Sequence, residues 1–133
     1  MIKSVGPSTT LLIPVSWGEF FDKISILEIK KENVSDNEAM KNIVRELELL
    51  NNFISDDISS NTHVMGLRIE LKALNQDIWN IEDEIRINEA SSDFGERFIE
   101  LARNTYLFND KRASIKRKIN NILNSTITEE KIY

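Results

Sequence analysis

Residues 64–85 read VMGLRIELKALNQDIWNIEDEI, and large apolar side chains recur along them at alternating spacings of three and four. The positions that carry this repeat are Val64, Leu67, Leu71, Leu74, Ile78, Ile81 and Ile85. A seven-residue apolar repeat is typical of a helix that packs along its whole length against a second helix. The pattern therefore predicts a long helix over residues 64–90.

A second repeat of the same kind follows a short polar segment at residues 91–95. Its positions are Phe98, Leu101, Thr105, Phe108, Arg112, Ile115, Ile119 and Ile122. The connection is too short for anything but an antiparallel return, so residues 64–90 and 96–124 predict one long antiparallel helical hairpin. We call the two repeats the seam. In the expected register, Leu74 lies beside Arg112 and Ile81 beside Thr105.

Two shorter helices and an extended arm are predicted before the hairpin. Helix starts are marked where a serine or aspartate precedes a glutamate by three residues: Ser16 with Glu19, Ser35 with Glu38, and Asp93 with Glu96. In such a pair the first side chain accepts from the third amide while the glutamate reaches back. The first helix runs from residue 17 to about residue 31. Residues 1–15 predict an extended arm or short strand packed on the helices, and residues 56–61 predict a polar break.

Composition limits the classes of protein to consider. A chain of 133 residues, 41% hydrophobic and 29% charged, is expected to fold as a single all-α domain over residues 1–133. It has no cysteine, which excludes disulfides and thiolate metal sites. Without a membrane-spanning apolar run or a secretory signal pattern, the expected location is the cytoplasm.

Charge is unevenly distributed. The net charge of −5 argues against a general nucleic-acid role. Residues 111–118, KRASIKRK, are nevertheless strongly basic. They can bind phosphates, or dock on the acidic N-terminal helices as charge-patterned helices ordinarily do. The second alternative is the commoner one.

The sequence holds no catalytic signature. It contains no glycine-rich phosphate loop and no zinc spacing, and its one histidine, His63, stands at a helix start where a solvated or capping role is expected. Paired carboxylates such as Glu46 and Glu48 face different sides of their helix, so no metal site is predicted. No cofactor is expected, and whether the protein is an enzyme stays open.

A polar–aromatic stripe beside the seam is the one place where a ligand site can be sought. Its candidate ligand-binding residues are Trp79, Glu82, Arg86, Arg103, Tyr106, Asn109, Arg112 and Lys116, and Asn75 begins the stripe. One interpretation is an inter-helix pocket in which arginine and lysine hold an anion beside an aromatic ring. The other is a structural network that fixes helix register. Arg112, on the seam, must lift its guanidinium outward or find a buried carboxylate.

Several sequence blocks resemble a known family. They are IPVSWGE at residues 13–19, DKI at 22–24, ILEIK at 26–30, WNIEDEIR at 79–86, DFGERF at 93–98 and NDKRA at 109–113. Together they resemble a small helical domain family of unknown function that occurs in bacteria and in phages of marine cyanobacteria. The resemblance covers nearly the whole chain, and it implies the host cytoplasm as the location if the protein is encoded by a phage. It implies a compact helical protein and carries over no activity or functional residues.

Two functional hypotheses follow. Apolar residues off the seam, at Ile69, Ile87, Ile99 and Leu107, exceed what one helix pairing consumes. This surplus must meet the first two helices or a second copy of the chain, so the leading hypothesis is a non-enzymatic protein-interaction module acting as a homodimer, with another protein as a further partner. The alternative is a binder, or an enzyme, of a small anionic or phosphate-containing ligand in the polar pocket.

Overall fold

A computed structural model describes residues 9–132, and within that range every regular element is an α-helix. The helices are α1 (Trp17–Asn33), α2 (Asn37–Asn51), α3 (Asp56–Ser59), α4 (Thr62–Ala90) and α5 (Glu96–Ile122). The predicted all-α class is therefore confirmed. The one-turn helix α3, capped by Ser55, lies where the sequence predicted only a polar break.

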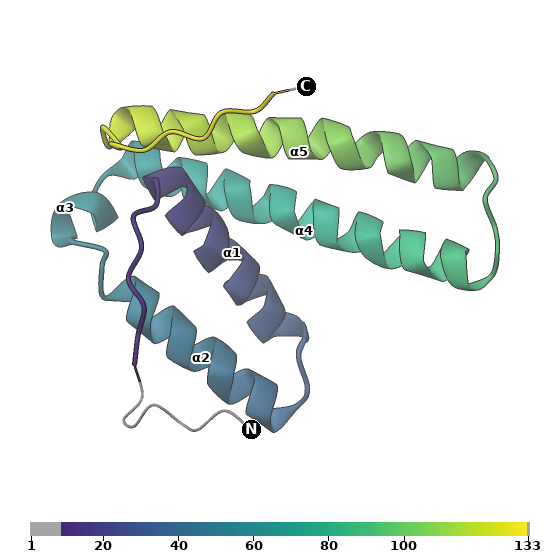
Figure 1. The fold of residues 1–133 in the computed structure, drawn as a ribbon, viewed down its shortest axis with the longest axis horizontal. Coiled ribbons are helices and arrows are strands. Elements are labelled where there is room, and N and C mark those ends of the chain that lie inside the picture. The colour runs from purple at the N-terminus through teal and green to yellow at the C-terminus, as the bar shows by residue number, and fades with distance from the viewer. Residues whose placement is uncertain (1–8, 133) are drawn as a thin grey trace, which may run out of the picture.

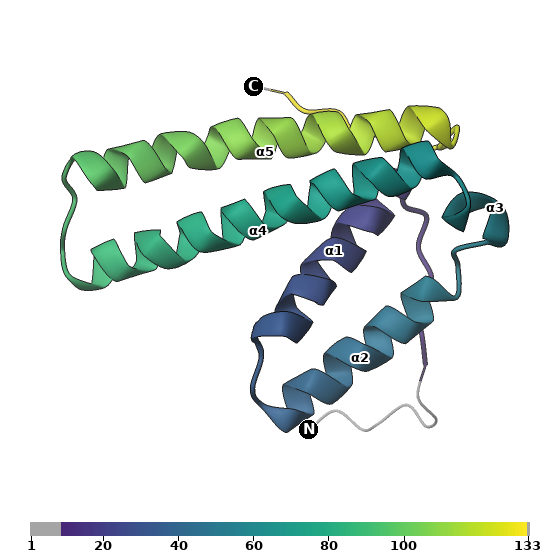
Figure 2. The same ribbon diagram turned by 180° about the vertical axis from the view of Figure 1, so that it is seen from behind.

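The two long helices α4 and α5 run antiparallel side by side, α1 packs against one end of the pair, and α2 lies on the outer side of α1 (Figures 1 and 2). Helix α1 contacts both α4 and α5, while α2 packs on α1. The fully buried side chains of Phe21, Ile24, Val64, Leu71 and Ile119 form the core where these elements meet. The rest of the hairpin, up to its turn at residues 91–95, projects beyond the core (Figure 1).

The seam of α4 is buried from Val64 to Ile81. On α5, Leu101 and Ile119 are buried, and the polar position Thr105 donates its hydroxyl to the carbonyl of Leu101 at 2.9 Å. Arg112 contacts Asn75, which is the neighbour of its expected partner Leu74. These contacts agree with helices that pack by the seven-residue repeat.

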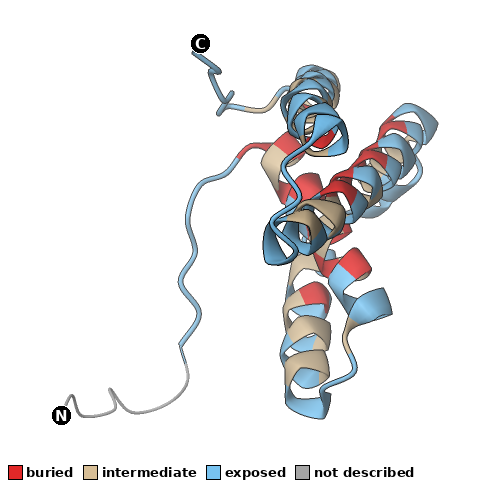
Figure 3. Ribbon diagram, turned by 90° about the vertical axis from the view of Figure 1, so that its right-hand side faces the viewer, coloured by how far each residue is buried: buried red, intermediate tan, exposed pale blue. Residues whose placement is uncertain are grey.

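The N-terminal arm differs from its prediction. Leu11, Leu12 and Ile13 are 86%, 73% and 66% exposed, so the described part of the arm does not pack on the helices and forms no strand. Figure 3 shows it standing away from them. Residues 1–8 of the predicted arm lie outside the described residues. Apolar residues in a segment do not by themselves show that the segment packs against another part of the same chain.

Only part of the predicted capping chemistry forms. Ser16 accepts from the amide of Glu19 at 3.1 Å, as predicted, but the carboxylate of Glu19 binds Lys116. The Ser35 prediction is wrong, because Asp36 caps α2 by accepting from the amide of Ala39. The third prediction is also wrong: α5 begins after Gly95 without a side-chain cap, and Asp93 accepts from the Gly95 amide.

The apolar residues off the seam stay uncovered in the single chain. Ile69, Ile87, Ile99 and Leu107 are 72%, 65%, 51% and 46% exposed. Of the two destinations expected for them, the first two helices are therefore excluded. Among the described helices, none combines the length and apolar character that a membrane crossing requires.

Candidate functional site

A buried polar cluster joins α1, α4 and α5. Asp22 and Ser25 lie one turn apart on the buried face of α1, and Asn75 lies opposite them on α4. The Asn75 amide nitrogen donates to Asp22 Oδ1 at 2.8 Å and to Ser25 Oγ at 2.7 Å, and Ser25 donates to the Asp22 carbonyl. Buried polar groups are stable when paired in this way, so the cluster fixes how α1 sits on α4.

Arg112 adds a third hydrogen bond to the Asn75 side chain. Its Nη1 donates to Asn75 Oδ1 at 3.1 Å, from a half-buried position on α5. Of the two outcomes expected for this seam arginine, neither occurs in the form anticipated: the guanidinium stays at the helix interface and binds an amide oxygen. Asn75 thus links one donor on α5 to two acceptors on α1.

Lys116 is the cationic centre of the cluster. Its side chain is only 12% exposed, and its Nζ lies 2.7 Å from Glu19, 3.1 Å from Glu129 and 3.8 Å from Asp22. Burial alone would lower the pKa of Lys116, but the hydrogen bonds and attraction of these carboxylates raise it above its ordinary value. Lys116 therefore stays charged and binds α1 and the C-terminal segment to α5.

Glycine lets α1 approach α5 closely at this point. The Gly18 amide donates to Asn120 Oδ1 at 2.6 Å, and a Cβ on Gly18 would lie 2.5 Å from the carbonyl oxygen of Lys116. The neighbouring amide of Trp17 donates to Ser125 Oγ at 3.2 Å. The first turn of α1 thus gives its free amides to side chains from the end of α5 and from the segment after it.

The structure brings only two of the eight predicted site residues into this cluster, Arg112 and Lys116. Trp79 and Asn109 are half-buried, and the Asn109 Oδ1 atom is buried without a hydrogen-bond partner in the described part of the chain. The exposed ones are Glu82, Arg86, Arg103 and Tyr106. Arg86 lies 3.9 Å from Asp83 on its own helix. The predicted pocket over all eight residues is therefore not assembled within one chain.

These remaining residues continue the face that the cluster begins. Trp79, Glu82 and Arg86 follow Asn75 at helical spacings of four, three and four, and Tyr106 and Asn109 precede Lys116 at corresponding spacings on α5. Helix α1 covers this face at Asn75 and Lys116. Beyond them the hairpin projects past α1 (Figure 1), so the same face continues without a covering helix.

Sequence reasoning missed the acidic half of the cluster. Asp22 directly follows Phe21 and Ser25 directly follows Ile24, so both polar residues interrupt the apolar face of α1, which indicates a buried polar pair. Glu129 carried no such sign, because it follows the last helix in a segment without periodicity. For the basic residues 111–118, one alternative was docking on the acidic N-terminal helices. Lys116 does this, because it pairs with Glu19 of α1.

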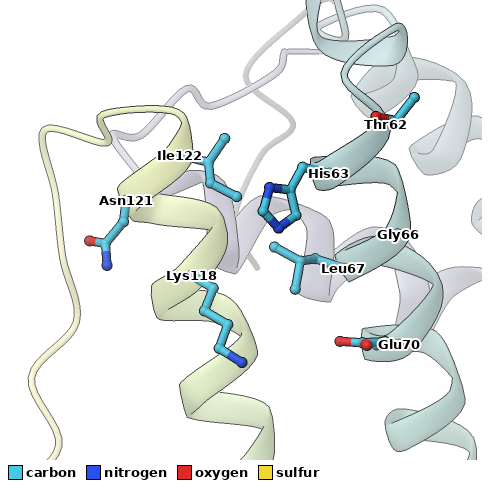
Figure 4. Close-up of a pocket in the computed structure, with 8 residues that line it drawn as sticks. All are labelled: Thr62, His63, Gly66, Leu67, Glu70, Lys118, Asn121 and Ile122. Atoms are coloured by element: carbon cyan, nitrogen blue, oxygen red, sulfur yellow. The ribbon is translucent and has the colours of Figure 1, made fainter.

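A hollow in the surface lies elsewhere. A shallow groove of about 580 Å³ separates the start of α4 from the end of α5, with His63 and Lys118 on its two sides (Figure 4). None of the predicted site residues lines it. Asn61, not His63, caps α4. Among residues 9–132 no group of three or more His, Asp and Glu side chains is placed to hold a metal ion.

The cluster is expected to stabilise the fold rather than hold a ligand, and Asn75→Ala tests this. The change leaves Asp22, Ser25 and Arg112 without their shared partner, at an expected cost of about 2 kcal/mol in the free energy of unfolding. Asn80→Ala, on the exposed side of α4, is the control and should stay within about 0.5 kcal/mol of the wild type. Urea unfolding followed by circular dichroism measures both. Equal stability of the two variants would contradict a structural role.

Comparisons with known proteins give one match. The model described as "Family of unknown function (DUF6165)" matches residues 11–133. No curated protein and no solved structure matches the chain.

Proposed function

This chain belongs to the family of unknown function whose model it matches, and we propose that it is a protein-interaction module that pairs with a second copy of itself. One observation carries the proposal. The face that α1 covers at Asn75 and Lys116 continues uncovered along the projecting half of the hairpin, where it presents Trp79, Tyr106 and Arg86. Trp, Tyr and Arg are the residue types that contribute most to binding in protein interfaces.

The projecting half of the hairpin contains only two helices, α4 and α5, which supports a second copy as the partner. Two antiparallel helices bury only the seam between them, and stable helical assemblies of this kind usually contain four helices. A second hairpin laid on the uncovered face would complete such a bundle. The second copy is the natural occupant, since each chain carries the same unfinished face.

Charge also favours a second copy. Glu82 and Arg86 lie one turn apart on the uncovered face, and both are exposed. In a two-fold antiparallel pairing centred between them, Glu82 of one copy lies opposite Arg86 of the other, and the reverse holds at the symmetry-related position. The face is thus complementary to itself, which favours pairing of identical chains.

A charge exchange tests the pairing. Glu82→Arg and Arg86→Glu each place like charges opposite one another twice per dimer, so each should weaken the dimer about tenfold in dissociation constant. The combined variant Glu82→Arg/Arg86→Glu restores opposite charges and should return toward the wild-type constant. Sedimentation velocity over a dilution series measures all three.

Glu70→Arg is the matched control, since it makes the same charge change on another face of α4 and should leave the constant unchanged. Helicity by circular dichroism must stay equal in all variants. If the combined variant weakens the dimer by the sum of the two single effects, measured as free energies of dissociation, the proposed register of the pairing is wrong. If no variant differs from the wild type, the proposed face is wrong.

The alternative of a small anionic ligand has less support. Its two best candidates, Arg112 and Lys116, already bind Asn75 and three carboxylates within the chain. The other candidate cations, Arg86 and Arg103, are exposed on the projecting half, and neither lines the groove beside His63 and Lys118. An interaction surface therefore accounts for more of the geometry.

A further inference from the structure

The segment after α5 turns back and lies along that helix (Figures 1 and 2). Asn124 adopts a left-handed backbone conformation with φ of 50°, and the Ser125 amide donates to the carbonyl of Asn120 at 2.9 Å, which reverses the chain. Ser125 also accepts from the amide of Trp17. The reversal is thus fixed at its base, and residues 126–132, which we call the tail, extend from it toward the middle of α5.

Charged contacts hold the tail at three points of α5. Lys116 binds the Glu129 carboxylate at 3.1 Å, and Lys131 lies 2.6 Å from Asp110. Arg117 lies 3.8 Å from Glu130 and donates to the Glu129 carbonyl at 3.4 Å. Two acids and a base of the tail, at residues 129–131, therefore face two bases and an acid of the helix, namely Lys116, Arg117 and Asp110.

We infer that this surface of α5 is a docking site for a short acidic peptide, and that the tail occupies it as a releasable strap. The inference is independent of the proposed pairing, because it rests on contacts within one chain. The chemical class of the ligand follows from these contacts. Lys116 and Arg117 pair with two successive carboxylates, and Asp110 pairs with a cation that follows them in the peptide.

Weak attachment makes the strap releasable. Among the described tail residues, Ile132 is 92% exposed and Ile127 38% exposed, so apolar burial at the outer end of the tail contributes little to docking. The ion pairs of Arg117 and Lys131 are also partly exposed, and such pairs contribute little individually. Ordering seven residues opposes them.

The core can tolerate release of the strap. Lys116 has three carboxylate neighbours, and two of them, Glu19 and Asp22, belong to α1. When Glu129 leaves, Lys116 keeps these two, so no buried charge is left without a partner. Glu129 is therefore the carboxylate whose loss Lys116 tolerates.

The absence of cysteine allows a direct test on the full chain. A nitroxide spin label on Ile132→Cys, an exposed position, reports whether the tail is docked and slow or released and mobile. Glu129→Gln should shift the equilibrium between docked and released tail about two- to fivefold toward release. Glu130→Gln, the adjacent control, removes the same charge without reaching Lys116 and should shift it less.

Competition tests the site itself. An added peptide with the tail sequence TITEEKIY should mobilise the label at millimolar concentration, while the same peptide with both glutamates replaced by glutamine should not. Circular dichroism checks that helicity is unchanged in every sample. The inference is overturned if Glu129→Gln leaves the label as slow as in the parent, or if the acidic peptide mobilises it no more than the neutral one.

Discussion

Leu71→Asp is expected to prevent folding of the hairpin or to lower the free energy of unfolding by at least about 4 kcal/mol. Leu71 is fully buried on the seam of α4 and belongs to the core that α1 shares with the hairpin. An aspartate there would be an unpaired charge among apolar side chains. Thermal unfolding followed by circular dichroism at 222 nm, a wavelength that reports helix, measures the loss.

Ile69→Asp provides a control two residues away on the same helix. Ile69 is 72% exposed, so the new carboxylate stays in water and stability should change by no more than about 0.5 kcal/mol. Similar losses for the two variants would mean that α4 buries a different face. That result would invalidate the seam and every contact argued from it.

Gly18→Ala is the second change with a large expected effect. A methyl group on Gly18 would meet the backbone of Lys116, with only 2.5 Å to the carbonyl oxygen, and a backbone cannot move aside as a side chain can. Helix α1 must therefore shift away from α5, which strains the contacts of Lys116 and Asn120. We expect a loss of about 3 kcal/mol in the free energy of unfolding.

Gly66→Ala separates this close approach from the general effect of glycine in a helix. Gly66 lies inside α4, and a Cβ there would meet nothing within 4 Å. Alanine is the better helix former, so this variant should gain about 0.5–1 kcal/mol. Chemical denaturation measures both variants. A Gly18→Ala protein as stable as the wild type would show that α1 does not approach α5 as described.

The hairpin could be predicted because its signal is local and repeated. Each seam residue of α4, from Val64 to Ile81, adds the same evidence for one face, so an error at one position changes little. Helix caps carry much less evidence. Ser35 and Asp36 are adjacent, and either side chain can accept from a backbone amide one turn later. The predicted helix start at Ser35 is one residue away from the observed cap, Asp36. Sequence spacing does not determine such a choice.

The polar cluster was only partly predictable. Asn75, Arg112 and Lys116 follow from the stripe beside the seam, because helical spacing places them on one side of the hairpin. Their acidic partners come from elsewhere in the chain: Glu19 and Asp22 lie 97 and 94 residues before Lys116, and Glu129 lies in a tail without periodicity. The polar residues on the buried face of α1 can be found in its sequence, but the sequence does not show which residues of α4, α5 or the tail they meet.

The exposed apolar residues show the same limit. Sequence alone gave the surplus at Ile69, Ile87, Ile99 and Leu107 but left two destinations open, the first helices or a second copy. The fold removes the first, because all four residues stay exposed in the single chain. Pairing with a second copy is therefore the central proposal.

The molar mass of the wild-type chain in solution tests that proposal most directly. Light scattering coupled to size-exclusion chromatography, run over a wide range of loading concentrations, separates one copy of 15.4 kDa from a pair of twice that mass. We expect the mass to rise with concentration and to level off at the value for two copies. A constant mass of 15.4 kDa up to the highest concentration that stays in solution would contradict the proposal.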